Sequence, residues 1–149
     1  MQVLAVKASG FQLLLPVNMV AQITGKLPVQ PGNLGIPGAA GLIQWREFNL
    51  PLFRTSELFG GKESDDDSYE RVVVLWPMKS AGTHSFIALT SLGPPRVVDV
   101  SGLPAADDDA EMPWALGYVN LADGLGVIPD IDALASEAWA AEDSPVNAE

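Results

Sequence analysis

The sequence predicts a mainly β protein made of two similar halves. Two apolar runs rich in β-branched residues, Arg71–Trp76 and Ser85–Thr90, have the composition of central strands. Fourteen Gly and twelve Pro among 149 residues suit the many tight connections of a small barrel or sandwich. A segment of the first half also recurs in the second half, with the same order of turn, strand, proline and short helix.

The remaining elements follow from shorter apolar stretches and the turn residues between them. Ser9-Gly10 separates two strands, and Ala122-Asp123-Gly124 separates two others. The further strands are expected at Val3–Val6, Phe11–Leu15, Arg96–Val100, Gly117–Leu121 and Leu125–Ile128. Short helices are expected at Val17–Thr24, at Thr55–Phe59 before a C-capping Gly60-Gly61, and at Asp132–Ala141 with Asp130 or Asp132 as N-cap.

The recurring segment gives the clearest view of the organisation. Gly41–Leu58 aligns without gaps over Gly117–Leu134, at a shift of 76 residues. The matched pairs include Gly41 with Gly117, Ile43 with Val119, Glu47 with Asp123, and Leu58 with Leu134. Because the shift is close to half the chain, the sequence predicts two similar β subdomains in which these segments superpose.

The composition limits the classes of function. The chain has no Cys and one His, His84, which excludes thiolate metal sites and Cys nucleophiles and leaves little for imidazole chemistry. Eight basic and nineteen acidic residues give a net charge of −11, which argues against a nucleic-acid partner. No apolar run approaches the ~18 residues of a membrane-spanning helix, and the N-terminal stretch lacks a signal-peptide pattern. We therefore expect a cytoplasmic protein with no enzymatic activity, no cofactor and no direct membrane insertion.

Two acidic runs and one histidine are the only candidates for chemistry. Asp65–Asp67 and Asp107–Asp109 lack the alternating ligands, turn glycine and later Glu of a calcium loop, so we expect solvated loops and no metal site. Two alternatives stay open. A small β-barrel hydrolase would need His84 close to Ser85, Ser91 or an Asp. A β-barrel nucleic-acid binder would need a basic groove with aromatic platforms, which the acidic last third of the chain opposes.

Several short motifs resemble those of the CheW-like coupling domains of bacterial chemosensory systems. The family's Gly-apolar-x-Asn-Leu-Arg-Gly stretch stands here as Gly41–Glu47, followed by Asn49–Leu52, and its Val-x-Glu-Ile stands as Val20–Ile23. The second half matches through Val72–Trp76, Phe86–Leu89 and Gly117–Leu134, so the resemblance spans residues 3–134. The Trp45-Arg46 version looks closest to stand-alone members from systems that control type IV pili.

The chain departs from the family pattern at three places. Glu47 replaces the usual Gly, Gln22 replaces the usual Glu, and Leu92-Gly93-Pro94 stands where the family has an Asp and a strand-like continuation. These departures leave open that the chain is a diverged CheW-like scaffold for another protein partner.

The resemblance implies two five-stranded SH3-like barrels side by side, with short helices and a C-terminal helix. It implies a single domain over residues 1–139, with subdomain 1 at about 11–69, subdomain 2 at about 1–10 and 70–139, and an acidic tail at 140–149. The function it implies is that of a non-enzymatic adaptor, which couples the cytoplasmic tip of methyl-accepting chemoreceptors to a CheA-type histidine kinase. Such an adaptor serves chemotaxis or pilus-driven twitching motility and is recruited to membrane-associated receptor arrays.

The resemblance also places a partner-binding surface. We expect Val20, Gln22, Gly41 and Arg46 to line one partly exposed patch at the junction of the subdomains, with Glu47 beside Arg46. Arg46 offers a planar fork of five donors for carbonyl or carboxylate groups of a partner, whereas the alternative is a surface Arg paired with a loop acid. Gly41 would let a partner backbone approach closely. The tryptophans Trp45, Trp76 and Trp114 are expected in the core or lining the groove, and Trp139 is expected to hold the C-terminal helix against a barrel.

Overall fold

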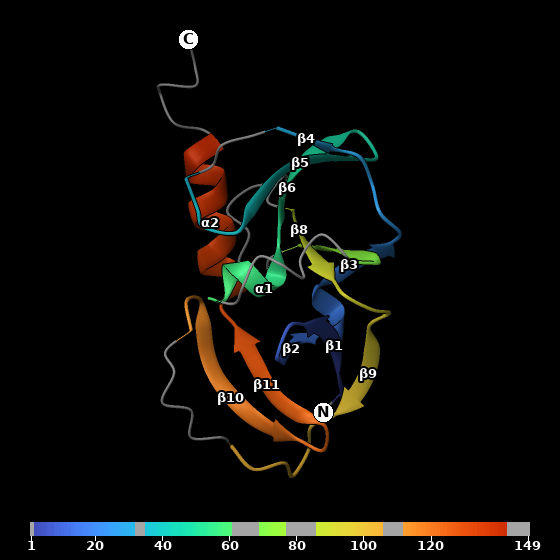
Figure 1. Cartoon of the computed structure of the whole chain (residues 1–149), viewed down its shortest axis with the longest axis vertical. Helices are drawn as coiled ribbons and strands as arrows, with labels where there is room; N and C mark the ends of the chain where they lie inside the picture. The colour runs from blue at the N-terminus through green and yellow to red at the C-terminus, as the bar shows by residue number, and fades with distance from the viewer. Residues whose placement is uncertain (1, 32–34, 61–68, 77–85, 106–111, 143–149) are drawn as a thin grey trace.

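The strands form two sheets, which divide the molecule into two halves along its longest axis (Figure 1). The computed structural model describes residues 2–31, 35–60, 69–76, 86–105 and 112–142. For residues 139–142 it describes the backbone alone. Half A is a five-stranded sheet in the order β10-β11-β2-β1-β9, and half B is a six-stranded sheet in the order β3-β7-β8-β6-β5-β4. The predicted mainly β fold with two SH3-like halves is confirmed; the extra strand of half B is the two-residue β4.

The elements have the following bounds. The strands of half A are β1 (Gln2–Ala8), β2 (Phe11–Pro16), β9 (Arg96–Asp99), β10 (Ala115–Leu121) and β11 (Gly124–Pro129). The strands of half B are β3 (Val20–Thr24), β4 (Val29–Gln30), β5 (Ala39–Trp45), β6 (Phe48–Phe53), β7 (Arg71–Leu75) and β8 (Ile87–Ser91). The helices are the short 3-10 helix η1 (Val17–Met19), α1 (Thr55–Leu58) and α2 (Ile131–Glu142).

The helix predicted over Val17–Thr24 is wrong for most of its length. Only Val17–Met19 is helical, as one 3-10 turn, and the chain then continues as β3, which pairs with β7. The β-branched residues Val20, Ile23 and Thr24 favour an extended backbone, and pairing with a central strand completes the preference.

The recurring segments adopt the same structure, as the sequence predicts. β5 pairs with β6, and β10 with β11, in registers that correspond residue by residue at the shift of 76. Both outer strands carry a bulge at the same place, before Gly41 and before Gly117. The match extends to a strand outside the aligned segments, because Val29 pairs with Ile43 just as Ala105 bridges to Val119.

The helices that follow the two hairpins start in the same way. The Arg54 N–H donates to the Gly38 carbonyl (2.7 Å), and the Asp130 N–H donates to the Trp114 carbonyl (2.6 Å). In α2 the Asp130 carboxylate also accepts a hydrogen bond from the Ala133 N–H (3.1 Å), so Asp130 is the N-cap. Each hairpin is therefore tied to its helix by an equivalent backbone bond.

Half B takes its strands from one continuous stretch of the chain, whereas half A combines strands from both ends of the chain. The hairpin β1–β2 belongs to half A with β9, β10 and β11, whereas the hairpin β7–β8 belongs to half B with β3 to β6 (Figure 1). The sequence analysis placed subdomain boundaries between residues 10 and 11 and between residues 69 and 70. In the structure, β1 and β2 share the sheet of half A, and β7 and β8 lie in the sheet of half B. A tight turn at Ser9-Gly10 keeps β1 and β2 antiparallel neighbours, from Ala8 opposite Phe11 to Val3 opposite Pro16, so no boundary falls between them.

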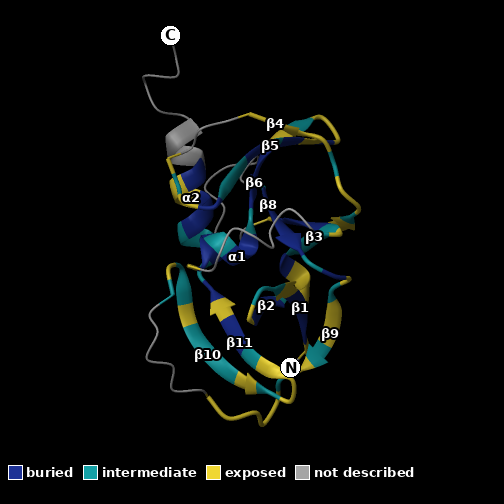
Figure 2. Cartoon of the chain, viewed as in Figure 1, coloured by how far each residue is buried: buried dark blue, intermediate teal, exposed yellow. Residues whose placement is uncertain are grey.

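Three clusters of apolar side chains hold the fold together. Figure 2 shows by colour how far each described residue is buried. Alternate residues of one strand point to different clusters: Val73 and Leu75 join the central core, whereas Val72 and Val74 join the core of half B. The central core takes residues from β1, β2, β7, β8 and both α-helices. On α2 it takes the helically spaced Ile131, Leu134, Ala135 and Ala138. The central core therefore lies between the halves and joins them.

Candidate functional site

The turn between β5 and β6 carries the predicted site residue Arg46. Trp45 pairs with Phe48 across the turn, and the two residues between them, Arg46 and Glu47, are both exposed. Arg46 has φ 56°, in the left-handed region that L-residues with a side chain rarely adopt. The Arg46 side chain is therefore exposed to solvent, and its backbone has an unfavourable conformation that surrounding contacts must stabilise.

That support comes from the side chain of Trp45. The guanidinium carbon of Arg46 lies 4.5 Å from the centroid of the Trp45 ring, which is a cation–π contact. At the edge of the same ring, the Trp45 Nε1–H donates to Gln22 Oε1 at 2.8 Å. Arg46 forms no ion pair with any described residue. Its guanidinium is therefore held in place while its hydrogen-bond donors remain available for a partner.

Trp45 belongs to a row of aromatic rings that leads from the interior to the surface. Phe86 lies 5.1 Å from Trp45 and 5.5 Å from Phe48, and Trp76 stacks on Phe86 at 6.3 Å with an interplanar angle of 9°. Trp45 is 6% exposed, whereas Trp76 is 52% exposed. The Trp76 indole N–H donates to the Asn18 carbonyl (3.1 Å), which fixes the ring against the start of β3. We call Gln22, Trp45, Arg46, Phe48, Phe86 and Trp76 the Trp45 cluster.

The other two predicted site residues contribute differently. Val20 is half-buried and packs against the central core, two residues before the exposed Gln22 on β3. Gly41 is buried, has φ 141°, and a Cβ there would lie 2.2 Å from the Gln30 carbonyl oxygen and 2.9 Å from Val29 Cγ1. The backbone that approaches Gly41 is therefore β4 of this chain. The close approach at Gly41 therefore has a cause within the chain, and the approach of a partner backbone there stays a prediction.

The structure thus brings Gln22 and Arg46 together through Trp45, a residue that the sequence analysis assigned only to the core or the groove. Glu47 is exposed beside Arg46, and Val20 lies nearby along β3. The exposed Trp76 adds apolar surface that the sequence analysis did not assign to the site. The one available signal was its position directly after a β-branched strand and before Pro77, where a strand ends.

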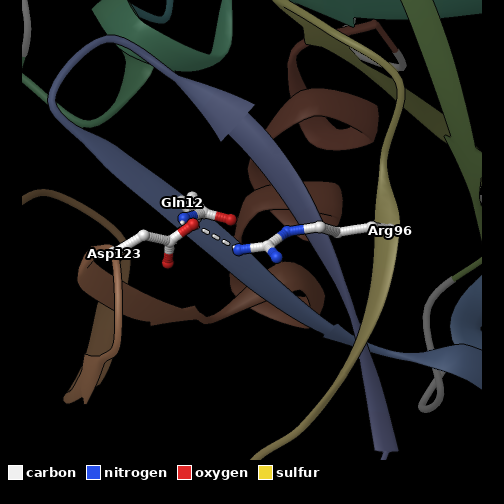
Figure 3. A network of polar contacts seen from close by, with 3 residues as sticks. All are labelled: Gln12, Arg96 and Asp123. Atoms are coloured by element: carbon white, nitrogen blue, oxygen red, sulfur yellow. Dashed lines mark hydrogen bonds and ion pairs between the residues drawn. The ribbon is translucent and has the colours of Figure 1, made fainter.

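Figure 3 shows a polar cluster of three side chains in half A: Gln12, Arg96 and Asp123. Asp123, in the β10–β11 turn, forms an ion pair with Arg96 on the edge strand β9 and accepts a hydrogen bond from Gln12 Nε2 (3.1 Å) on β2. Both carboxylate oxygens of Asp123 are thus occupied. Lys7 and the turn residues Gly10 and Gly124 line an adjoining open pocket of about 420 Å³. The cluster joins opposite edges of the sheet of half A, and its groups are engaged with one another.

The structure does not test the sequence's candidates for metal binding and catalysis. His84 and both acidic runs, Asp65–Asp67 and Asp107–Asp109, lie outside the described residues, as does the side chain of Trp139. Over the ranges that the structure describes, no three His, Cys, Asp or Glu side chains are placed to share a metal ion. None of the described helices is long and apolar enough to cross a membrane.

Comparison with known proteins agrees with this fold. The family model of the CheW-like domain matches residues 2–138. Among solved structures, the scaffolding protein TtCheW from Thermoanaerobacter tengcongensis matches with a TM-score of 0.63 and 13% sequence identity, over 86% of this chain and 82% of that chain. A comparison with curated protein sequences gives no significant match.

Proposed function

Because the chain belongs to the family of CheW-like domains, we propose that it is a non-enzymatic adaptor that couples chemoreceptors to a CheA-type histidine kinase. The receptor's cytoplasmic tip binds at the Trp45 cluster, with Val20 and Glu47 at its margin. The adaptor acts in the cytoplasm, is recruited to membrane-associated receptor arrays, and serves chemotaxis or the twitching motility of type IV pili.

The observation that supports this proposal is that the Arg46 side chain is exposed and held on the Trp45 ring. Its guanidinium lies on the Trp45 indole ring and forms no ion pair with a described residue, and the same row of rings continues through Phe86 to the half-exposed Trp76. Arg and Trp are the residues that most often dominate protein–protein interfaces, because they combine apolar area with directed polar contacts. A docking partner with a carboxylate or carbonyl group over Arg46 and apolar side chains over Trp76 fits this surface.

The kinase docks on a different face in this proposal. An adaptor must hold two partners at once, so the two contacts require separate surfaces. The central core joins both halves through α1, α2 and the first hairpin, and this provides a firm body between the two contacts. Loss of one contact therefore leaves the other intact.

Binding measurements with the two partners test the proposal. The wild-type protein, Arg46→Ala and the control Arg71→Ala are titrated with the cytoplasmic fragments of the source organism's chemoreceptors and with its CheA-type kinases. Arg71 begins β7, at the opposite end of that strand from Trp76. Arg46→Ala should weaken receptor binding by about 1–3 kcal/mol, as hot-spot truncations do. Kinase binding and thermal stability should be retained, and Arg71→Ala should leave both contacts unchanged.

Two results would contradict the proposal. If wild-type protein binds neither receptors nor kinases, the chain is a CheW-like scaffold for another partner. If Arg46→Ala lowers the melting temperature and weakens both contacts together, Arg46 has a structural role and the receptor surface lies elsewhere.

A further inference from the structure

We infer that Gln22 and Trp45 are positioning residues that set Arg46 for its partner, with Gln22 acting on Arg46 through the indole of Trp45. The inference rests on the proposed function, because it concerns how the same surface reads its partner. It also changes the role of Gln22, which the family resemblance places among the residues that touch the receptor.

The geometry forms a chain of three side chains from two distant strands. Gln22 on β3 accepts the Trp45 indole N–H at 2.8 Å, and the Arg46 guanidinium carbon lies 4.5 Å from the centroid of that indole. The hydrogen bond fixes one edge of the ring, and the neighbouring rings of Phe48 and Phe86, at 6.4 and 5.1 Å, limit its tilt. A ring that cannot turn presents one fixed face to a cation, and that face determines where the guanidinium rests.

The other half of the molecule shows that packing alone does not require this arrangement. At the shift of 76, Val98 on β9 corresponds to Gln22, and Leu121 on β10 corresponds to Trp45. Val98 and Leu121 both pack on the apolar core of half A, so two plain apolar side chains fill the same positions there. Half B replaces them with a hydrogen-bonded pair that carries a cation, which points to a role beyond packing.

The backbone of the turn supports the same reading. Arg46 has φ 56°, whereas Ala122, at the same position of the β10–β11 turn, is not among the described residues with positive φ. A left-handed arginine is unfavourable on its own, because Cβ approaches the following carbonyl oxygen. The contact with the indole opposes that cost, and it does so only while Gln22 keeps the ring in place.

The consequence is a surface whose specificity depends on a residue that need not touch the partner. With the indole fixed, Arg46 offers its donors in one direction, which favours a partner carboxylate or carbonyl group at one location. With the indole free, the guanidinium samples many directions, and ordering it on binding weakens the contact.

A double-mutant cycle with the receptor fragment tests the inference. Arg46→Ala should weaken binding about tenfold, within the range of hot-spot residues. Gln22→Leu should weaken it about two- to fivefold, the factor that corresponds to loss of an exposed cation–π contact. The variant with both changes should bind no more weakly than Arg46→Ala alone, because Gln22 acts only through Arg46. Gln22→Glu, whose carboxylate accepts the same indole N–H, should restore binding to within about twofold of wild type.

A nuclear magnetic resonance measurement on the free protein supplies a readout that does not depend on the receptor. In the wild-type protein, nuclear Overhauser contacts should join the Arg46 side chain to the Trp45 ring. They should be lost in Gln22→Leu and kept in Gln22→Glu, while the amide spectrum of the remaining strands stays unchanged.

Each outcome decides the inference. If the losses of Gln22→Leu and Arg46→Ala multiply in the double variant, Gln22 touches the partner directly and the inference is wrong. If the Arg46–Trp45 contacts persist in Gln22→Leu, Gln22 does not position Arg46 and the inference is equally wrong. If the contacts follow Gln22 as expected but the wild-type protein binds no receptor, the positioning stands and the proposed function fails.

Discussion

The hairpins β5–β6 and β10–β11 share one backbone design but carry different chemistry. Their registers, their bulges, the covering strand and the bond that starts the following helix correspond at a shift of 76 residues. Their turns differ: Trp45-Arg46-Glu47 presents an exposed cation on an indole, whereas Leu121-Ala122-Asp123 directs a carboxylate into contacts with Arg96 and Gln12. The comparison shows that strand pairing determines the backbone of both hairpins, whereas the side chains of the turns can differ and make different contacts.

Among the described residues, Gly41 and Gly117 differ in how closely their neighbours approach. Gly41 lies directly under β4, so a side chain there has no room. At Gly117, within the described residues, an added Cβ would meet only Ile128 Cδ1, at 3.9 Å. The same contrast occurs before each hairpin, where Gly38 lies against the Leu58 backbone and Trp114 occupies the equivalent position with a large side chain.

The largest effect is expected from the glycine pair. Gly41→Ala should destabilise the protein by about 2–4 kcal/mol, because Cβ would clash with the Gln30 carbonyl and the backbone has positive φ. Gly117→Ala should change stability by less than about 1 kcal/mol. Urea unfolding followed by circular dichroism measures both. Equal losses at the two glycines would mean that the hairpins are covered alike.

The second largest effect on stability is expected from the buried hydrogen bond between Thr55 and Thr90. Thr90 Oγ1 accepts the Thr55 N–H (3.0 Å), and both residues are 1% exposed; at the shift of 76 the position of Thr55 is taken by the apolar Ile131. Thr90→Val should cost about 1–3 kcal/mol of unfolding free energy, because it leaves the Thr55 amide buried without its acceptor. Thr24→Val, on the edge strand β3, is the control and should cost less than about 0.5 kcal/mol. A loss at Thr90 as small as that of the control would show that the amide finds another acceptor.

A smaller difference is expected from the backbone of the β5–β6 turn. Arg46→Gly should be about 1 kcal/mol more stable than Arg46→Ala, because glycine adopts positive φ without the steric cost of a Cβ. Ala122→Gly, at the equivalent turn position, should give no such gain. Thermal unfolding of the three variants measures the difference. Arg46→Gly and Arg46→Ala of equal stability would mean that the turn relaxes once the arginine is removed.

The smallest expected effect is a pH dependence at the end of β9. Hydrogen bonds from the Ser101 backbone N–H and then from its side chain lower the pKa of Asp99 from 3.8 to about 2. Because the folded-state pKa is lower than the ordinary value, this carboxylate stabilises the fold above pH 3.8, and the contribution disappears as the pH falls toward 2. A carbon-13 titration of the Asp99 carboxyl measures the midpoint. A midpoint close to 3.8 would show that Ser101 does not hold the carboxylate in solution.

The sequence predicts the strands and the repeat well, because both depend on local patterns. Alternating apolar residues and turn residues mark β1, β2, β7 and β8, and the ungapped alignment marks the equivalent hairpins. It did not predict which strands share a sheet, because pairing such as that of Gln12 with Gly126 depends on residues far apart in the chain. Local patterns contain no information on such partners.

Within the candidate site, the sequence indicates where Arg46 lies better than what its neighbours contact. Arg46 is exposed in a turn as expected, and Gln22 lies near it. The hydrogen bond from Trp45 to Gln22 crosses from β5 to β3, so no spacing rule reveals it. Gly41 has no room for a side chain because β4 lies against it, and β4 is only two residues long and leaves a weak pattern in the sequence.

The assembly of half A from both ends of the chain has a consequence for how the protein must fold. The sheet of half A is not complete until strands from both ends of the sequence have met: the Gln12–Asp123 contact in half A joins residues 111 positions apart. Such non-local closure slows folding, since the entropy of a long loop is lost before its contacts form. During synthesis, β3 to β6 leave the ribosome before β7 and β8, and their edges stay unpaired meanwhile. A fragment that ends after α1 therefore cannot form a complete barrel alone. If the chain is divided after α1, the two fragments can reassemble only when β1–β2 of the first joins half A and β7–β8 of the second joins half B.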